Sequence, residues 1–398
     1  MPKAILLVLD SFGIGAMEDC EEERPQDVNA HTYLHIREVT GLTLPTLYHL
    51  GLNQLVDGTG LARGAFGRAA LAHFGADTYM GHQELMGSRP LKPVRRLMRE
   101  VGESIASALQ EAGCKVTVPW DHRPILLVED AVVVADNIES DKGNIINVTA
   151  DLSRISFADT LKIASRVRET VDVSRVIALG GPYTSIEQIL SVVREHHPGQ
   201  WGVDSPRAKV YGEGYQVRHL GYGVRIEQQF PYLAEQSGVP VYRIGKTADV
   251  LYGEGVALPH VETKQVLEAL EQLYTTEKGD AAFLVTVQET DLAGHQENPE
   301  WYASLLQQVD EWLGRFLRRL QGDDLLIITA DHGNDPTIGH SRHTREYTPI
   351  LVTGPGVKPG PIGTRTTMAD IGATLSQLFG LPPTESGTSF LREIYLQR

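Results

Sequence analysis

Cysteine and long apolar stretches are both scarce in this chain of 398 residues. The two cysteines, Cys20 and Cys114, exclude a disulfide-stapled scaffold and are typical of a protein from a reducing compartment. No apolar run reaches the roughly 18 residues that a membrane-spanning helix requires. The first apolar run begins so near the start of the chain that no secretory leader is expected. We therefore expect a cytoplasmic protein that does not contact a membrane.

Basic residues are outnumbered, with 36 Lys and Arg against 51 Asp and Glu and a formal net charge of −15. This balance argues against nucleic acid as a partner, because phosphate backbones are bound by basic surfaces. A site that handles phosphate in such a chain needs a local positive field, which metal ions can supply. The apolar share of 41% is ordinary for a globular protein. At this length we expect two domains, or one domain with a large insertion.

Three apolar runs lead into acidic residues, and two of these segments add a histidine; the runs cover residues 4–9, 283–287 and 325–330. The first ends at Asp10, the second leads to Asp291 and His295, and the third leads to Asp331 and His332. A single Asp after a strand is most often a turn or cap residue. Three at the same edge of a parallel sheet instead predict a metal site. Mixed oxygen and nitrogen ligands suit Mn²⁺ or Zn²⁺ better than Ca²⁺.

A second pattern surrounds Thr78, within the stretch Ala76–Gly87. Thr78 precedes residues that can continue as a helix, so its simplest role is that of a helix N-cap. The alternative role is chemical, because a hydroxyl at a helix N-terminus can accept a phosphoryl group that the backbone N–H groups hold. Threonine is a poor nucleophile at neutral pH, but coordination to a divalent metal lowers its pKa. The sequence leaves both roles open.

Strand and helix patterns alternate regularly in the first and last parts of the chain, and a middle segment interrupts this alternation. We expect a strand at 239–244 and helices at 263–274 and 300–320, which continue the alternation of a doubly wound α/β core. The middle segment mixes short strands with helices and loops rich in glycine and charge. We therefore expect a catalytic core made of residues 1–92 and 223–398, interrupted by an inserted α+β cap of residues 93–222.

These motifs resemble the phosphopentomutase family, which belongs to the alkaline phosphatase superfamily and is close to the cofactor-independent phosphoglycerate mutases. In the core the resemblance rests on Asp10–Gly15, Asp77–Gly87, Asp331–Thr337 and His343–Tyr347. In the inserted segment it rests on Thr149–Asp151 and Val173–Ala178. The resemblance spans nearly the whole chain and implies an α/β fold of the alkaline phosphatase type, with a doubly wound core and a cap.

The resemblance also implies two Mn²⁺ ions, with Zn²⁺ or Mg²⁺ as replacements, and a phosphoryl group carried on the hydroxyl of Thr78. One ion would be bound by the Thr78 hydroxyl together with Asp10, Asp331 and His332. The other would be bound by Asp291, His295 and His343. The spacing of four between Asp291 and His295 is that of the phosphoglycerate mutases, whereas phosphopentomutases have five.

For the substrate, the resemblance assigns contacts to Asp151 in the cap and to Lys246 in the core. The chain departs from the family after Ala178, where Leu179–Gly180–Gly181 stands in place of an arginine. Arg207, Lys209 and Arg218 are the candidates for the distal phosphate site, and a solvated surface charge is the alternative role for each of them.

The function implied is a phosphomutase that interconverts the 1-phospho and 5-phospho forms of ribose or deoxyribose, with a sugar bisphosphate as activator. A metal-dependent phosphatase or phosphodiesterase of the same superfamily is the alternative, as is a mutase for another phosphorylated substrate. A sulfatase is disfavoured, because neither cysteine is followed two residues later by proline. A binding protein with a vestigial site is disfavoured by the complete set of metal-binding residues.

Overall fold

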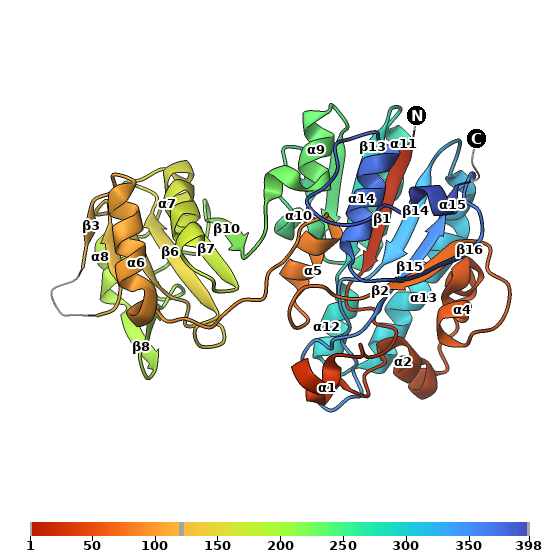
Figure 1. Ribbon diagram of the computed structural model, residues 1–398, viewed down its shortest axis with the longest axis horizontal. Helices are drawn as coiled ribbons and strands as arrows, with labels where there is room; N and C mark the ends of the chain where they lie inside the picture. Colours follow the sequence, from red (N-terminus) through yellow and green to blue (C-terminus); the bar gives the residue numbers. More distant parts are fainter. Residues whose placement is uncertain (1, 119–122, 396–398) are drawn as a thin grey trace. The chain divides into compact units, whose positions relative to one another are not determined.

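The computed structural model describes residues 2–118 and 123–395 and divides them into two compact units (Figure 1). The first unit contains the described residues up to Pro90 and from Arg225 onward, and the second is Leu91–Val224. The boundaries expected from the sequence lie after residues 92 and 222. Each unit has its own hydrophobic core.

The first unit is built on an eight-stranded sheet with the order β12-β11-β13-β1-β14-β15-β2-β16. All neighbouring strands run parallel except at β15, which is antiparallel to both β14 and β2. The central strands are mostly apolar and almost completely buried, as expected for parallel strands with helices on both faces of the sheet. The strands are β1 Lys3–Leu9, β2 Ala65–Ala69, β11 Val241–Gly245, β12 Val256–Leu258, β13 Ala281–Val287, β14 Leu325–Thr329, β15 Thr348–Thr353 and β16 Gly360–Arg365.

Most helices of this unit form two groups, and each helix contacts at least one other member of its group. One group is α2 Thr32–Thr40, α3 Pro45–Leu47, α11 Thr263–Thr276, α12 Glu289–His295 and α13 Pro299–Phe316. The other is α5 Thr78–Leu85, α9 Phe230–Gln236, α10 Thr247–Val250 and α14 Ala369–Leu378. Short helical pieces complete the unit: α1 Cys20–Glu23, α4 Asn53–Val56, α15 Leu391–Ile394, 3₁₀ turns at Pro25–Asp27, Ile226–Gln228 and Leu317–Arg319, and a π turn at Tyr48–Leu52.

The second unit is built on a six-stranded sheet with the order β10-β7-β6-β5-β4-β3, in which only β6 and β7 are parallel. Alternate residues of β5 point to opposite faces: Val132 and Val134 join the core under α6 and α7, whereas Val133 joins the core with α8. The elements are α6 Met98–Glu111, β3 Val116–Thr117, β4 Leu126–Val128, β5 Val132–Asp136, β6 Ile145–Asp151, α7 Phe157–Thr170, β7 Arg175–Gly181, α8 Ile186–Ser191, β8 Val193–His197, β9 Gln200–Val203 and β10 Gln216–Gly221.

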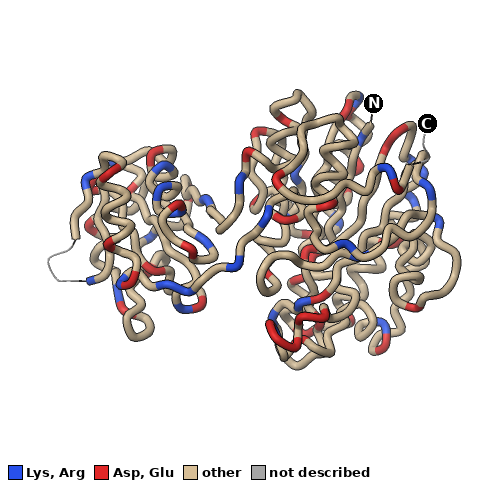
Figure 2. Tube along the Cα trace, in the orientation of Figure 1, with Lys and Arg blue, Asp and Glu red and all other residues tan. Residues whose placement is uncertain are grey.

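This architecture confirms the expected fold class, a doubly wound α/β core interrupted by an α+β insertion. The expected strand 239–244 is β11, and the expected helices 263–274 and 300–320 are α11 and α13 with slightly different ends. Acidic and basic residues are interspersed over both units, and acidic residues gather along α1 (Figure 2). Within the described residues, none of the helices combines the length and the apolarity needed to cross a membrane.

Candidate active site

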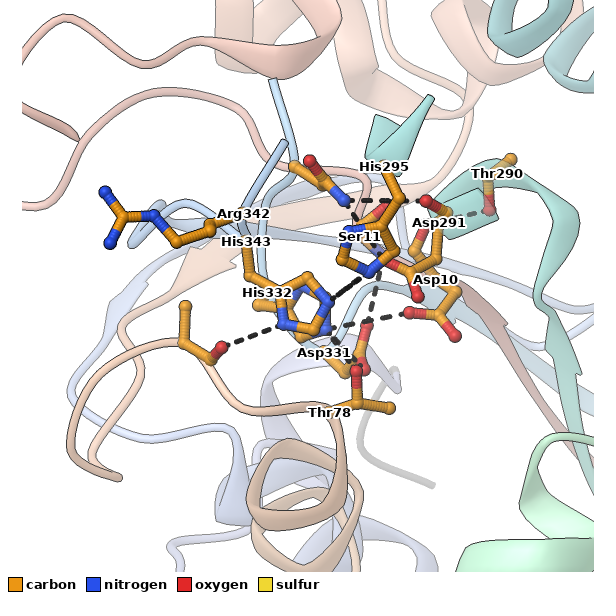
Figure 3. Close-up of polar contacts among 12 residues, drawn as sticks. Asp10, Ser11, Thr78, Thr290, Asp291, His295, Asp331, His332, Arg342 and His343 are labelled. Atoms are coloured by element: carbon orange, nitrogen blue, oxygen red, sulfur yellow. Dashed lines mark hydrogen bonds and ion pairs between the residues drawn. The ribbon is translucent and has the colours of Figure 1, made fainter. Parts of the chain in front are cut away.

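The four neighbouring strands β11, β13, β1 and β14 bring the charged residues of the site to one edge of the core sheet. Lys246 follows β11, Asp10 follows β1, and Asp331 with His332 comes just after β14. Asp291 lies in the first turn of α12, the helix that follows β13. Because these strands are parallel and adjacent, their carboxyl ends deliver the side chains to one place (Figure 3).

The first group of potential metal ligands is Asp10, Asp331 and His332, all fully buried. His332 Nε2 lies 3.2 Å from Asp331 Oδ2 and 3.7 Å from Asp10 Oδ1. Burial and the neighbouring Asp331 carboxylate raise the pKa of Asp10 to about 7. Burial lowers the pKa of His332, but the adjacent Asp331 carboxylate outweighs burial and raises it to about 9.

The second group is Asp291, His295 and His343, whose potential ligand atoms also converge. The Nε2 atoms of His295 and His343 are 3.0 Å apart, and they lie 3.4 and 3.2 Å from Asp291 Oδ1. Burial opposes ionisation of Asp291, but hydrogen bonds from the two imidazoles prevail and hold its pKa well below the usual range.

A divalent metal fits these two groups. The Nδ1 atoms of the three histidines lie within hydrogen-bond distance of backbone carbonyl oxygens: His295 of Ser341, His332 of Gly333 and His343 of Ala76. When each Nδ1 donates its hydrogen to a carbonyl oxygen, the ring is held with Nε2 facing the site and with the lone pair of Nε2 available to a metal. Asp10 Oδ1 is buried and accepts no hydrogen bond among the described residues, so this oxygen is available as a metal ligand.

Thr78 is the first residue of α5, and its Oγ1 lies 2.7 Å from His332 Nε2. The N-cap role that the sequence left open for Thr78 belongs instead to Asp77, whose side chain accepts a hydrogen bond from Met80 N at 2.9 Å. The Thr78 hydroxyl is therefore not needed to start the helix. It lies at the edge of the first group of ligands (Figure 3).

Lys246 places a cation among the carboxylates. Its Nζ lies 2.6 Å from Asp10 Oδ2 and 3.1 Å from Asp291 Oδ2. Burial disfavours the ammonium, but the surrounding carboxylates outweigh burial and raise the pKa of Lys246. At neutral pH the ammonium of Lys246 and the protonated His332 offset most of the charge of the three carboxylates, so a phosphate dianion would need further positive charge there.

The groups that support Asp10 and Asp331 were not predicted from the sequence. Ser11 has a left-handed backbone (φ 65°), which directs its N–H to Asp331 Oδ1 at 3.1 Å. Its hydroxyl lies 3.1 Å from the hydroxyl of Tyr302, a fully buried residue of α13. Ser11 belongs to the Asp10 motif, but Tyr302 lies far away in the sequence and follows no recognisable pattern.

The candidate substrate residues of the cap lie in different environments. Asp151 is fully buried at the end of β6, where it accepts hydrogen bonds from Ser153 N and Oγ and from Ile186 N. These bonds give its carboxylate a structural role at the start of α8. Arg207 is mostly exposed, with Nε 3.6 Å from Asp204, and Arg218 is half-buried on β10. A side chain at Gly181 would meet the carbonyl oxygen of Val210 at 2.4 Å, so the end of β7 has no room for a longer residue.

The chain matches the model of the metalloenzyme superfamily over residues 2–383, so it belongs to that superfamily. Curated phosphopentomutases of Kosmotoga olearia and Symbiobacterium thermophilum are 32% and 30% identical to it. Each alignment covers 98% of this chain, and the two cover 99% and 98% of the respective relatives. Within the superfamily the chain belongs to the phosphopentomutase family, which makes it an isomerase.

Two solved structures are similar along nearly the whole chain at low sequence identity. The phosphoglycerate mutase of Leishmania mexicana is 14% identical with a TM-score of 0.49, and the match covers 100% of this chain and 98% of the other. The alkaline phosphatase of Thermus thermophilus is 12% identical with a TM-score of 0.38, and the match covers 97% and 93%.

Proposed function

We propose that this enzyme interconverts the 1-phospho and 5-phospho forms of ribose or deoxyribose by carrying the phosphoryl group on Thr78. The reaction class is supported by family membership, because the relatives of K. olearia and S. thermophilum are named phosphopentomutases. The residue assignment rests on one observation. Thr78 Oγ1 lies at the start of α5 and 2.7 Å from His332 Nε2, beside the first group of ligands.

In the forward transfer, a bond forms between Thr78 Oγ1 and phosphorus while the bond from phosphorus to the sugar oxygen breaks. The proton lost from the Thr78 hydroxyl is balanced by the proton that the departing sugar oxygen takes up. A different hydroxyl of the same sugar then takes the phosphoryl group and restores the free threonine. The N-terminal end of the α5 dipole favours the negative charge of the phosphothreonine. A sugar bisphosphate can form the same phosphothreonine, because one of its phosphoryl groups can pass to Thr78 and leave a sugar monophosphate.

Two divalent ions, which we assign as Mn²⁺ with Zn²⁺ or Mg²⁺ as replacements, fit the two groups of ligands. Asp10, Asp331, His332 and the Thr78 hydroxyl would hold one ion, and Asp291, His295 and His343 would hold the other. When bound, such ions lower the pKa of a coordinated hydroxyl and stabilise the attacking and leaving oxygens of an in-line transfer. Lys246 already contributes positive charge beside Asp10 and Asp291.

The proposal is tested by ³¹P NMR of the purified enzyme with ribose 5-phosphate, Mn²⁺ and a catalytic amount of a sugar bisphosphate. We expect a new ribose 1-phosphate signal and little inorganic phosphate. Inorganic phosphate alone would favour the phosphatase alternative, and no change with any pentose phosphate would favour a mutase for another substrate. Mass spectrometry of the quenched enzyme should locate the phosphate on Thr78. Phosphate on Ser11 or Ser88 would contradict the assignment.

A further inference from the structure

His82 belongs to the Thr78 motif but has no part in the reaction described so far. It lies four residues after Thr78 on α5, and only 1% of its surface is exposed. Its Nδ1 lies 2.9 Å from the carbonyl oxygen of Thr78 and 3.2 Å from Asp331 Oδ2. Its Nε2 lies 2.9 Å from the hydroxyl of Thr286 on β13. One imidazole therefore contacts the helix of the phosphoryl acceptor, a residue just beyond the end of β14, and strand β13.

The contacts of His82 define the tautomer of a neutral ring. Both groups beside Nδ1, the Thr78 carbonyl and the Asp331 carboxylate, are hydrogen-bond acceptors, so Nδ1 must carry the hydrogen. Nε2 then accepts a hydrogen bond from the hydroxyl of Thr286. The Nδ1–H bond to the Thr78 carbonyl is the shorter contact, and the approach to Asp331 Oδ2 adds electrostatic attraction.

The Asp331 carboxylate is held from two sides in this arrangement. Ser11 N donates to Oδ1, and Oδ2 is bordered by His332 Nε2 and His82 Nδ1, each at 3.2 Å. The backbone of α5 also lies close to Asp331, because a Cβ at Gly81 would meet the Asp331 carbonyl oxygen at 2.7 Å. Loss of the His82 N–H would remove the electrostatic attraction to Oδ2, which accepts no hydrogen bond among the described residues, and the contact with the Thr78 carbonyl.

We propose that His82 is a positioning residue that sets the Thr78 hydroxyl and the Asp331 carboxylate in one fixed arrangement. The inference rests on the proposed function, because it takes Asp331 as a metal ligand and Thr78 as the phosphoryl acceptor. Its physical basis is that hydrogen-bond partners behind a metal ligand hold the ligand in the orientation the metal needs. His82 serves the ligand and the acceptor from a single nitrogen.

Two substitutions distinguish the role of Nδ1 from that of Nε2. His82→Asn places an amide N–H where Nδ1 lies and keeps the donor for Thr78 and Asp331. His82→Gln places its amide near the position of Nε2, beside Thr286, and removes that donor. His49→Gln is the matched control, because His49 also contacts the carbonyl oxygen four residues before it, that of Pro45, but is exposed and not among the residues of either ligand group. The folded state of each variant is verified by circular dichroism.

The primary measurement is Mn²⁺ affinity by electron paramagnetic resonance, which counts free ions and separates two sites of different strength. We expect His82→Gln to weaken one of the two sites by about 10- to 100-fold, with His82→Asn and His49→Gln close to the wild type. A second readout needs no metal, because the ¹⁵N shifts of the His82 ring in the metal-free protein should report the Nδ1–H tautomer. An Nε2–H tautomer, an unchanged affinity in His82→Gln, or an equal loss in His82→Asn would overturn the positioning role.

Isomerisation measured on the same preparations keeps this inference separate from the proposed function. A wild-type enzyme that isomerises pentose phosphates while His82→Gln retains full affinity for both ions overturns the positioning role alone. A wild-type protein that binds two ions, loses one in His82→Gln and isomerises no pentose phosphate supports the positioning role and overturns the proposed function.

Discussion

At the scale of single residues, the site contains several buried charges whose burial is unfavourable in the metal-free protein. Asp10 and Asp331 are both fully buried, and Lys246 supplies the nearby ammonium. Ionised groups are costly to bury unless they are paired. Burial and Asp331 raise the pKa of Asp10 to about 7, whereas Asp331 raises that of His332 to about 9. Metal binding must therefore displace protons from this group.

The first prediction is that Mn²⁺ affinity at the first group of ligands rises with pH. His332 carries a proton below about pH 9 in the metal-free protein and must lose it to bind a metal, so each pH unit below 9 costs about tenfold in affinity. Below about pH 7 the loss should steepen, because Asp10 must then lose a proton too. Calorimetry in buffers of different ionisation enthalpy measures the protons released. His332→Ala is the control, since its weaker binding should release fewer protons than binding to the wild type, although loss of the His332 charge raises the pKa of Asp10 further.

The second prediction distinguishes the residue that stabilises the start of α5 from the residue that carries the phosphoryl group. Asp77 caps the helix, so Asp77→Ala should lower the free energy of unfolding by about 1 kcal/mol. Thr78→Ala removes a hydroxyl that does not cap the helix, so stability should change by less than about 0.5 kcal/mol while phosphoryl transfer is lost. Denaturant unfolding and ³¹P NMR measure the two effects. A Thr78→Ala protein that still isomerises would rule out Thr78 as the carrier.

At the scale of elements, the strand order explains how much of the site the sequence could reveal. Asp10 and Asp331 could be found because each follows a continuous run of mostly apolar residues, which is recognisable in the sequence. The edge strands β12 and β16 were not expected, since both are partly exposed and neither contains a long apolar run. The N-cap of α5 was expected at Thr78 and lies one position earlier, at Asp77, because Asp and Thr are both favourable N-cap residues.

The supporting contacts could not be read from the sequence, because they join residues far apart along the chain. Tyr302 reaches Ser11 across 291 positions, and His82 reaches Thr286 across 204. Hydrogen bonds of this kind depend on the finished packing of α13 and α5 against the sheet, for which no local periodicity exists. The hydrogen bond that Asp151 accepts from Ile186 N, 35 residues further along the chain, could not be read from the sequence for the same reason.

The third prediction concerns the packing of α5 against the end of β14. Gly→Ala within a helix normally stabilises by about 0.5–1 kcal/mol. At Gly81, however, the new methyl group would lie 2.7 Å from the Asp331 carbonyl oxygen and 3.0 Å from its Cβ. Gly81→Ala should therefore displace α5, lower stability and weaken both metal binding and isomerisation. Gly102→Ala on α6 is the matched control, because its methyl group would meet only Met98 Cε at 3.7 Å. Equal thermal stability and activity in both variants would contradict this account.

At the scale of the whole molecule, the two units have separate hydrophobic cores, and the candidate catalytic residues are concentrated in one of them. All six candidate metal ligands, Thr78 and Lys246 belong to the first unit. The second unit is an insertion whose two ends lie side by side, since Leu91 N donates to the carbonyl oxygen of Tyr222 at 3.3 Å. A short linker can therefore replace the insertion without stretching the chain.

The last prediction is that the insertion decides what becomes of the phosphothreonine. An isomerase must hold the sugar and exclude water while a second hydroxyl takes the place of the first, and a closed site does both. When Leu91–Val224 is replaced by a short Gly-Ser linker, the first unit should fold, bind two metal ions and accept a phosphoryl group from ribose 5-phosphate. The freed sugar should then escape, so that ³¹P NMR shows slow release of inorganic phosphate in place of ribose 1-phosphate. Isomerisation by the shortened protein at the wild-type ratio to hydrolysis would mean that the first unit retains the sugar by itself, and the insertion would then need another role.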